Sequence, residues 1–225
     1  KDKCTKFEFK SIEDRNFTGT FKGWLPAEDE YDKIFITDVQ VPDELVSIVD
    51  TQKYVIIDHH KSHIDVKDRY KRAKVILKEY ESATKLIIDT FPNSKDIPDE
   101  VLKLADIIND YDSYQLKLPE TLKINAIFGT YTNPRVKSFV QNFGNGIRPF
   151  TTYEQNAVKL YLNKLKEQLE ADCFEGEIKG YKVVSCFANY AVNEVAHFML
   201  KKHKADIAII VNLQTKSINF RRSRT

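Results

Sequence analysis

Short apolar runs alternate along the chain with stretches of helical period. Ile34–Thr37 and Val55–Ile57 are rich in β-branched residues, and short runs of this kind are typical of buried strands. Between them, Pro42-Asp43-Glu44 is typical of a first helical turn, because proline is tolerated there and acids complement the helix dipole. The pattern therefore predicts strand, helix and strand over residues 34–58, the components of a parallel sheet.

The rest of the chain gives further element predictions. We expect helices at 77–91, 98–112, 151–169 and 192–202, strands at 6–10, 206–212 and 216–221, and a hairpin at 177–184. Residues 14–32, with Gly19, Gly23, Pro26 and several acids, are expected to be loop with at most one short element, and the polar, basic stretch 61–74 is expected to be loop. The fold class predicted is α/β: a mostly parallel sheet flanked by helices, plus a smaller C-terminal α/β domain.

Composition narrows the class of protein. With 42% hydrophobic and 30% charged residues among 225, the chain is typical of a soluble globular protein. Apolar runs such as Ile207–Val211 are too short to cross a bilayer, and there is no signal-peptide pattern, so we expect a cytoplasmic protein without a membrane partner. Cys4, Cys173 and Cys186 are few, odd in number and widely spaced, which argues against a disulfide framework or a thiolate zinc site.

The candidate chemistry follows the two predicted strands. Asp38 comes directly after the first strand, and Asp58-His59-His60 ends and follows the second. Because the carboxyl ends of parallel strands lie at one edge of a sheet, we expect the Asp38 carboxylate close to the His59 ring. Carboxylates with imidazoles suit Mn²⁺ or Mg²⁺, and a pair of such ions promotes phosphoester hydrolysis. The pattern therefore predicts a metal site for phosphoester chemistry.

Several of the acids and histidines also have simpler structural interpretations. Asp38 alone would be an ordinary acid before a helix, and a single histidine is more often structural than a ligand. We expect His63, in a polar stretch, to be exposed, with a substrate contact as the alternative. His197 and His203 are assigned to packing or to the surface.

Five passages resemble the DHH phosphoesterase family. They are Ile36-Thr37-Asp38, Ile57-Asp58-His59-His60, Glu81-Ser82-Ala83-Thr84, Asn109-Asp110-Tyr111-Asp112 and Ser217-Ile218-Asn219-Phe220-Arg221-Arg222-Ser223. The family includes RecJ-type exonucleases, oligoribonucleases (nanoRNases), cyclic-dinucleotide phosphodiesterases, manganese pyrophosphatases and exopolyphosphatases. The Asp-Tyr-Asp form is most similar to the nanoRNase-like and cyclic-nucleotide-phosphodiesterase-like branch.

The resemblance implies a metal-ligand set and two cofactor ions, Mn²⁺ or Mg²⁺. Asp38 would bridge the ions, His59 would bind one of them, and Asp110 would complete that site. Asp112 is the alternative to Asp110, either as the ligand or as a group that supports it. Two acids at the end of a predicted helix oppose the helix dipole, which itself calls for a functional reason.

The resemblance also implies catalytic and substrate-binding residues beside the metals. His60 would lie beside the phosphate, and Asp58 would orient its neighbours. Arg221, Arg222 and Ser223 would bind the substrate phosphate, since a planar guanidinium matches a phosphate fork.

The resemblance further implies a domain order. We expect a metal-binding catalytic domain at 1–125, a helical connection at 126–172 and a substrate-binding domain at 173–225, which we expect to be truncated. The family's first motif, Asp-x-Asp-Gly, and its late Gly-Gly-His stretch do not occur in the sequence. Both would fall at an end of the chain, so we expect them to lie outside it.

The function expected is metal-dependent hydrolysis of short single-stranded oligonucleotides to mononucleotides. One alternative is a phosphoesterase for a cyclic nucleotide, a cyclic dinucleotide or pyrophosphate. Another is a non-catalytic nucleic-acid-binding module with a degenerate metal site. The partner expected is a short single-stranded nucleic acid or a nucleotide, and a homodimer is left open.

Overall fold

The computed structural model describes residues 7–12, 16–91, 96–132 and 134–223. The chain divides into two compact units: residues 1–121 with 131–148, and residues 122–130 with 149–225. Each unit contains a β-sheet and helices, which confirms the predicted α/β class. Among the described residues, no helix combines the length and the apolar character needed to cross a membrane.

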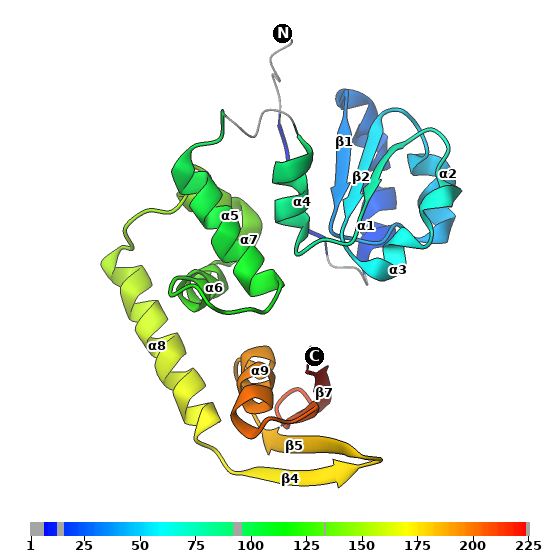
Figure 1. The fold of residues 1–225 in the computed structure, drawn as a ribbon. Coiled ribbons are helices and arrows are strands. Elements are labelled where there is room, and N and C mark those ends of the chain that lie inside the picture. Colours follow the sequence, from blue (N-terminus) through cyan, green and yellow to red (C-terminus); the bar gives the residue numbers. More distant parts are fainter. Residues whose placement is uncertain (1–6, 13–15, 92–95, 133, 224–225) are drawn as a thin grey trace. The chain divides into compact units, whose positions relative to one another are not determined.

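The first unit is built on a three-stranded parallel sheet in the order β1-β2-β3 (Figure 1). Its strands are β1 (Ile34–Thr37), β2 (Tyr54–Asp58) and β3 (Lys74–Leu77), and α2 (Asp43–Val49) connects the first two. All five residues of β2 are buried, because this strand lies in the centre with helices on both sides. The predicted strand–helix–strand unit is thus confirmed.

Two clusters of apolar side chains cover the two faces of this sheet. On one face, Ile56 packs with Leu45 of α2 and with Phe21 of α1 (Phe17–Trp24). On the other face, Val55 and Ile57 pack with Leu86 of α4 (Ala83–Thr90). Successive residues of β2 therefore serve opposite faces, as the pleat of a strand requires. Helices thus cover both faces of the sheet. The polar residues that follow β2 lie at the carboxyl edge of the sheet, between these two layers of helices.

Several sequence-based predictions for the first unit were wrong. Residues 7–10 have no regular secondary structure, and Lys6 of the predicted strand lies outside the described residues. The expected loop at 14–32 contains α1 and the 3₁₀ helix η2 (Leu25–Glu30). Phe17 and Phe21, one helical turn apart, are buried and stack with ring centroids 5.4 Å apart. Burial of these two rings stabilises a helix that Gly19 and Gly23 made improbable on local propensity.

The polar stretch 61–74 also contains regular structure. It holds α3 (Lys61–Ile64), the short 3₁₀ helix η3 (Lys67–Arg69) and the first residue of β3. The predicted helix at 77–91 begins only at Ala83, where the Ser82 hydroxyl accepts the N–H of Lys85 at 3.2 Å and caps it. Leu77 instead ends β3, whose pairing with β2 decides the conformation of this segment.

Two more helices complete the first unit. They are α5 (Asp99–Asp112) and α7 (Arg135–Phe143). After α7, the Ile147 N–H donates to the Glu100 carbonyl at 2.9 Å. Gly146 makes this close approach possible, because its φ is +101° and a Cβ there would lie 2.3 Å from the Glu100 carbonyl carbon.

The N-terminal end of α4 holds α5 in place. The buried Ser82 hydroxyl donates to the Asn109 side-chain oxygen at 2.6 Å, and the Asn109 amide donates to Glu81 at 2.8 Å. These bonds fix the last turn of α5, which carries Asp110 and Asp112, against the segment that follows β3.

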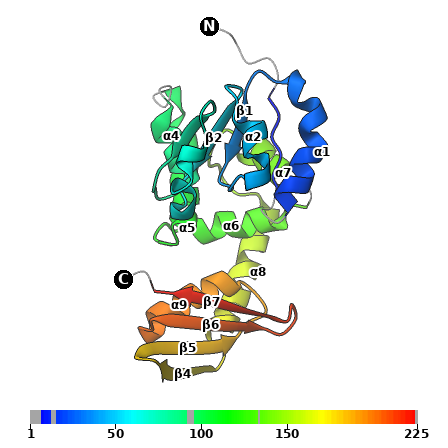
Figure 2. The ribbon, with the colours of Figure 1, turned by 90° about the vertical axis from the view of Figure 1, so that its right-hand side faces the viewer.

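The second unit contains a mixed four-stranded sheet in the order β4-β5-β6-β7 (Figure 2). The strands are β4 (Cys173–Ile178), β5 (Tyr181–Phe187), β6 (Ile207–Asn212) and β7 (Ser217–Arg222). The two outer pairs are antiparallel, and β5 with β6 is parallel through the crossover helix α9 (Val192–His203). The unit also contains α6 (Thr121–Thr130), apart from its first residue, and α8 (Thr152–Leu169).

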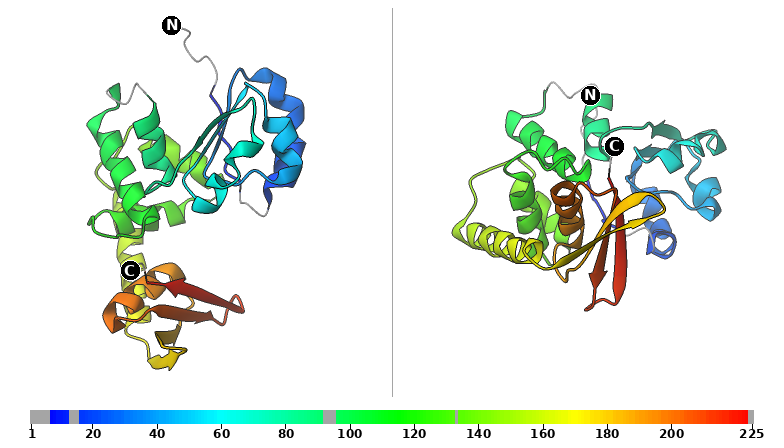
Figure 3. Two further views of the ribbon diagram at one scale, coloured as in Figure 1. Left: turned by 45° about the vertical axis from the view of Figure 1, so that its right-hand side comes forward. Right: turned by 60° about the horizontal axis from the view of Figure 1, so that its bottom comes forward.

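Helix α9 covers one face of this sheet, as both views of Figure 3 show. Its Val195 and Met199 are fully buried, as are Val184, Ala208 and Ile210 of the central strands. The buried apolar core of the second unit therefore lies between α9 and the sheet.

A reciprocal cap begins α8 and gives a stability prediction. The Thr151 hydroxyl accepts the Glu154 N–H at 3.3 Å, and the Glu154 carboxylate accepts the Thr151 N–H at 2.8 Å. Thr151→Ala is expected to lower the free energy of unfolding by about 1 kcal/mol, because it removes this cap. Urea denaturation measures the change. Thr152→Ala is the matched control and should change the value by less than about 0.5 kcal/mol; equal losses in the two variants would contradict the prediction.

Candidate metal centre

Asp38 follows β1 in a left-handed backbone conformation. Its φ is +59°, while its N–H still donates to the Ile57 carbonyl at 3.0 Å. Few residues other than glycine adopt this region, although aspartate and asparagine tolerate it better than most. Such conformations concentrate at functional sites. The residue thus ends β1 at the same sheet edge at which Asp58, His59 and His60 end and follow β2.

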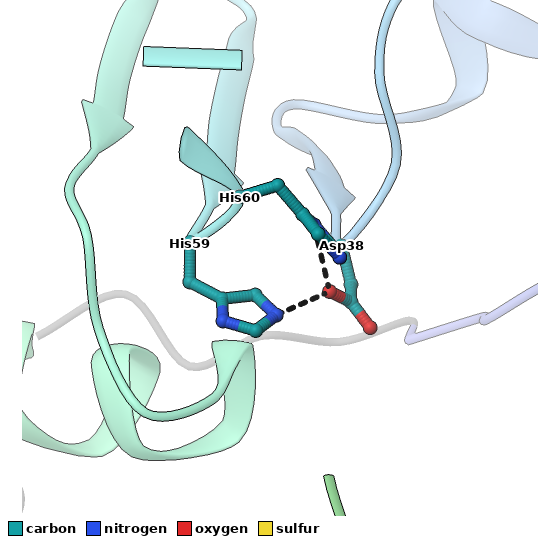
Figure 4. A group of neighbouring side chains, drawn as sticks. All are labelled: Asp38, His59 and His60. Carbon is teal, nitrogen blue, oxygen red and sulfur yellow. Dashed lines mark ion pairs between the residues drawn. The ribbon is translucent and has the colours of Figure 1, made fainter. Parts of the chain in front are cut away.

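His59 lies between a carbonyl and two carboxylates. Its Nδ1 is 3.1 Å from the Tyr80 carbonyl oxygen, which can only accept, so Nδ1 carries the proton and donates. In the neutral ring, Nε2 then carries the lone pair. That Nε2 lies 3.3 Å from Asp38 Oδ1 (Figure 4) and 3.6 Å from Asp112 Oδ2. It is buried and forms no hydrogen bond with any described residue.

This arrangement fits a divalent cation. Three electron-rich atoms face one another without a donor between them, which is unfavourable unless a positive charge joins them. Burial raises the pKa of the Asp38 carboxyl, and the negative charge of Asp112 raises it further, against the opposing effect of His59 and His60. The ligand atoms of Asp38, His59 and His60 all lie within 4.8 Å of one another. Carboxylate and imidazole donors of this kind bind divalent cations.

Asp58 holds two imidazoles. Its Oδ1 accepts both the backbone N–H and the Nδ1–H of His60, each at 2.8 Å, and its Oδ2 accepts the Nδ1–H of His63 at 2.5 Å. Burial alone would raise the pKa of Asp58, whose side chain is 1% exposed, but the hydrogen bonds from His60 and His63 outweigh it and lower the pKa. The ionised carboxylate therefore fixes the orientation of both rings.

His63 is not the exposed loop residue that was expected. It lies in α3, its side chain is only 14% exposed, and it donates to Asp58. Asp58, His60 and His63 form a second group whose ligand atoms lie within 4.8 Å of one another. Its atoms already pair as donors and acceptors, so the group needs no cation. The spacing of three residues between His60 and His63, which places two side chains on one side of a helical turn, is the signal that was missed.

Asp110 and Asp112 have different environments. Asp110, 6% exposed, accepts the N–H groups of Lys117 and Leu118 at 3.0 Å each and the Thr121 hydroxyl at 2.5 Å. Burial alone would raise the pKa of Asp110, but these three hydrogen bonds outweigh it and lower the pKa. The carboxylate beside His59 belongs to Asp112. The structure thus brings Asp38, His59 and Asp112 together, and it directs the Asp110 carboxylate to the segment that follows α5.

The predicted phosphate-binding residues lie at the end of β7 in the second unit. The Arg221 guanidinium donates to the Asn193 side-chain oxygen at 3.5 Å, and Arg222 pairs with Ile207 of β6 in the sheet. The Ser223 N–H donates to the Asp206 carbonyl at 2.8 Å. Their contact with a substrate stays a prediction.

Comparisons with known proteins found only distant structural similarity. No family model matches the chain, and no curated protein matches it. An uncharacterized protein from Helicobacter pylori G27 is 14% identical, with 93% of this chain and 76% of that chain covered and a TM-score of 0.29. A putative family II inorganic pyrophosphatase from Methanococcus jannaschii is 18% identical, with 75% of this chain and 60% of that chain covered and a TM-score of 0.24. At these identities and TM-scores, the likeness does not assign a function to this chain.

Proposed function

We propose that this chain is a Mn²⁺- or Mg²⁺-dependent phosphoesterase that hydrolyses phosphodiester bonds in short single-stranded oligonucleotides. The observation that carries the proposal is the buried His59 Nε2, which faces the carboxylates of Asp38 and Asp112 without a donor between them. The resemblance of the Asp-His-His and Asp-Tyr-Asp passages to DHH phosphoesterases supplies the substrate class.

Asp38, His59 and Asp112 are the residues that would hold a metal ion, with Asp38 as the bridge where two ions bind. Bound divalent ions would activate a water molecule and balance the charge on the phosphoryl oxygens. The chain itself orients the ligands: the Tyr80 carbonyl fixes the tautomer of His59, so that its lone pair is directed at the two carboxylates.

His60 and the end of β7 are assigned to the substrate phosphate. The His60 side chain is 50% exposed, so a substrate can reach it, and its Nδ1 lies 3.8 Å from Asp38 Oδ1. The hydrogen bond to the buried Asp58 fixes the orientation of the ring. Arg221, Arg222 and Ser223 add charge and hydrogen-bond donors suited to phosphate oxygens.

Hydrolysis by the purified protein tests this function. After removal of metals with EDTA, Mn²⁺ or Mg²⁺ is restored and four substrates are offered: a dinucleotide, a long single strand, a cyclic dinucleotide and pyrophosphate. We expect the dinucleotide to be cleaved fastest and cleavage to require the added ion.

The other outcomes separate the alternatives. Faster cleavage of the cyclic dinucleotide or of pyrophosphate would instead assign a small-molecule phosphoesterase. Binding of the long single strand without cleavage of any substrate would favour a nucleic-acid-binding module. Cleavage that persists in EDTA would overturn the metal-dependent mechanism.

A further inference from the structure

A second group of reactive side chains lies in the second unit, apart from the residues assigned to the metals. Cys173 begins β4, and its Sγ is 3.4 Å from Nε2 of His203, the last residue of α9. The other ring nitrogen, Nδ1, is 2.9 Å from a carboxylate oxygen of Glu175. Cys173 and Glu175 are two residues apart on one strand, so both face the same side of the sheet.

The order of these groups is that of a nucleophile, a base and a group that orients the base. The Glu175 carboxylate can only accept, so His203 Nδ1 donates to it and Nε2 is left as the acceptor that faces the thiol. This nucleophile–base–orienting relation is the structural signature of an activated nucleophile. The cysteine is therefore part of a three-residue arrangement drawn from two elements thirty positions apart.

Lys182 supports the arrangement from the neighbouring strand. Its ammonium lies 3.1 Å from the second Glu175 oxygen and donates to the His203 carbonyl at 2.6 Å. The hydrogen bond from His203, and then that from Lys182, hold the pKa of Glu175 below its ordinary value. Glu175 therefore stays ionised at neutral pH and keeps the His203 ring oriented. The His203 side chain is only 13% exposed, which limits competition from water.

We propose that Cys173 is an activated thiol and a site of covalent modification by hydroperoxides and other small electrophiles. In the reaction with a hydroperoxide, the thiol proton passes to His203 Nε2 while the sulfur attacks the terminal peroxide oxygen. The S–O bond forms as the O–O bond breaks, and the leaving oxygen takes the proton from His203. Cys173 is thereby oxidised by two electrons to a sulfenic acid, and the peroxide is reduced to water or an alcohol.

The other described cysteine is different. Cys186 lies directly opposite Cys173 in the β4–β5 ladder, yet it is 2% exposed, and burial raises the pKa of its thiol. A buried and protonated thiol reacts slowly. Of these two described cysteines, Cys173 is therefore the one expected to react first. Because Cys186 is the cross-strand partner of Cys173, a Cys186→Ser background prevents a disulfide between them and keeps the first product available for trapping.

Alkylation and oxidation of the full chain test the proposal. Limiting iodoacetamide at pH 7, followed by digestion and mass spectrometry, measures the labelling rate of the Cys173 peptide. His203→Gln should lower this rate by about 10-fold or more, and Glu175→Gln should lower it less, because the ring then remains but loses its orientation. Glu177→Gln, on the same face of β4, is the matched control and should leave the rate unchanged.

Hydrogen peroxide with dimedone, in the Cys186→Ser background, should give a dimedone adduct on Cys173 that His203→Gln strongly reduces. Urea denaturation checks that each variant is folded. An unchanged labelling rate in a folded His203→Gln protein, or no adduct on Cys173 in the parent, would overturn the proposal. These readouts need neither metal nor phosphoester, so the result is independent of the function proposed above.

Discussion

Asp38→Asn is expected to lower the rate of metal-dependent phosphodiester hydrolysis by roughly 10³-fold. The reason is that weaker metal binding removes several kcal/mol of electrostatic stabilisation from the transition state. Asparagine tolerates the left-handed conformation of Asp38, so the substitution removes the charge and keeps the backbone. Titration calorimetry with Mn²⁺ should show weaker binding in the same variant. Steady-state assays with the dinucleotide measure the rate.

Glu44→Gln is the control for this experiment. Glu44 is an exposed acid of α2, and its ion pair with Lys22, at 3.6 Å, lies at the surface. Glu44→Gln should therefore leave both the hydrolysis rate and the Mn²⁺ affinity unchanged. If Asp38→Asn keeps full activity and its unfolding midpoint shows that it is folded, Asp38 is not a metal ligand and the proposed metal site is wrong.

Asp110→Ala is expected to lower the free energy of unfolding by about 2 kcal/mol, because it leaves the buried Thr121 hydroxyl and the N–H groups of Lys117 and Leu118 without their acceptor. The pKa of Asp110 is lowered in the folded protein, so its stabilising effect is complete above the unfolded pKa of about 3.9 and is lost as the pH falls through the folded value. The difference in unfolding free energy between wild type and Asp110→Ala should therefore become smaller at acidic pH. Urea denaturation from pH 7 to pH 3 measures it.

Two variants of the same helix complete this test. Asp106→Ala removes a surface ion pair with Lys85 and should cost less than about 1 kcal/mol. Asp112→Asn should weaken Mn²⁺ binding and leave the unfolding free energy nearly unchanged. If Asp110→Ala instead weakens metal binding without destabilising the metal-free protein, Asp110 is a ligand and our choice of Asp112 fails.

The core of the first unit could be predicted because its signals are local. Ile34–Thr37 and Tyr54–Asp58 are short, apolar and flanked by polar residues, and Pro42 with its acids begins the helix between them. Parallel pairing then brings the residues after the two strands to one edge, which is why Asp38 and His59 could be expected to meet.

Elements that depend on distant partners could not be predicted. The four residues of β3 form a strand because they pair with β2, and Phe17 and Phe21 of α1 are buried by the sheet that they cover. The local signal in these segments is short, a run of three apolar residues in β3 and two phenylalanines in α1, and packing on the rest of the unit decides their conformation.

The sequence by itself determined the α/β class and the meeting of acids and imidazoles at one sheet edge, because strand period and parallel connectivity are local or topological properties. Only the tertiary structure decided which helix acid faces His59. Side chains two residues apart on a helix point in directions that differ by about 200°. The rotation of α5 about its axis therefore places Asp112 beside His59 and directs Asp110 toward the segment that follows α5, where it accepts the Thr121 hydroxyl. Tertiary packing likewise decided that His63 pairs with Asp58 and that Cys173 meets His203, since each contact joins side chains whose directions depend on how separate elements pack.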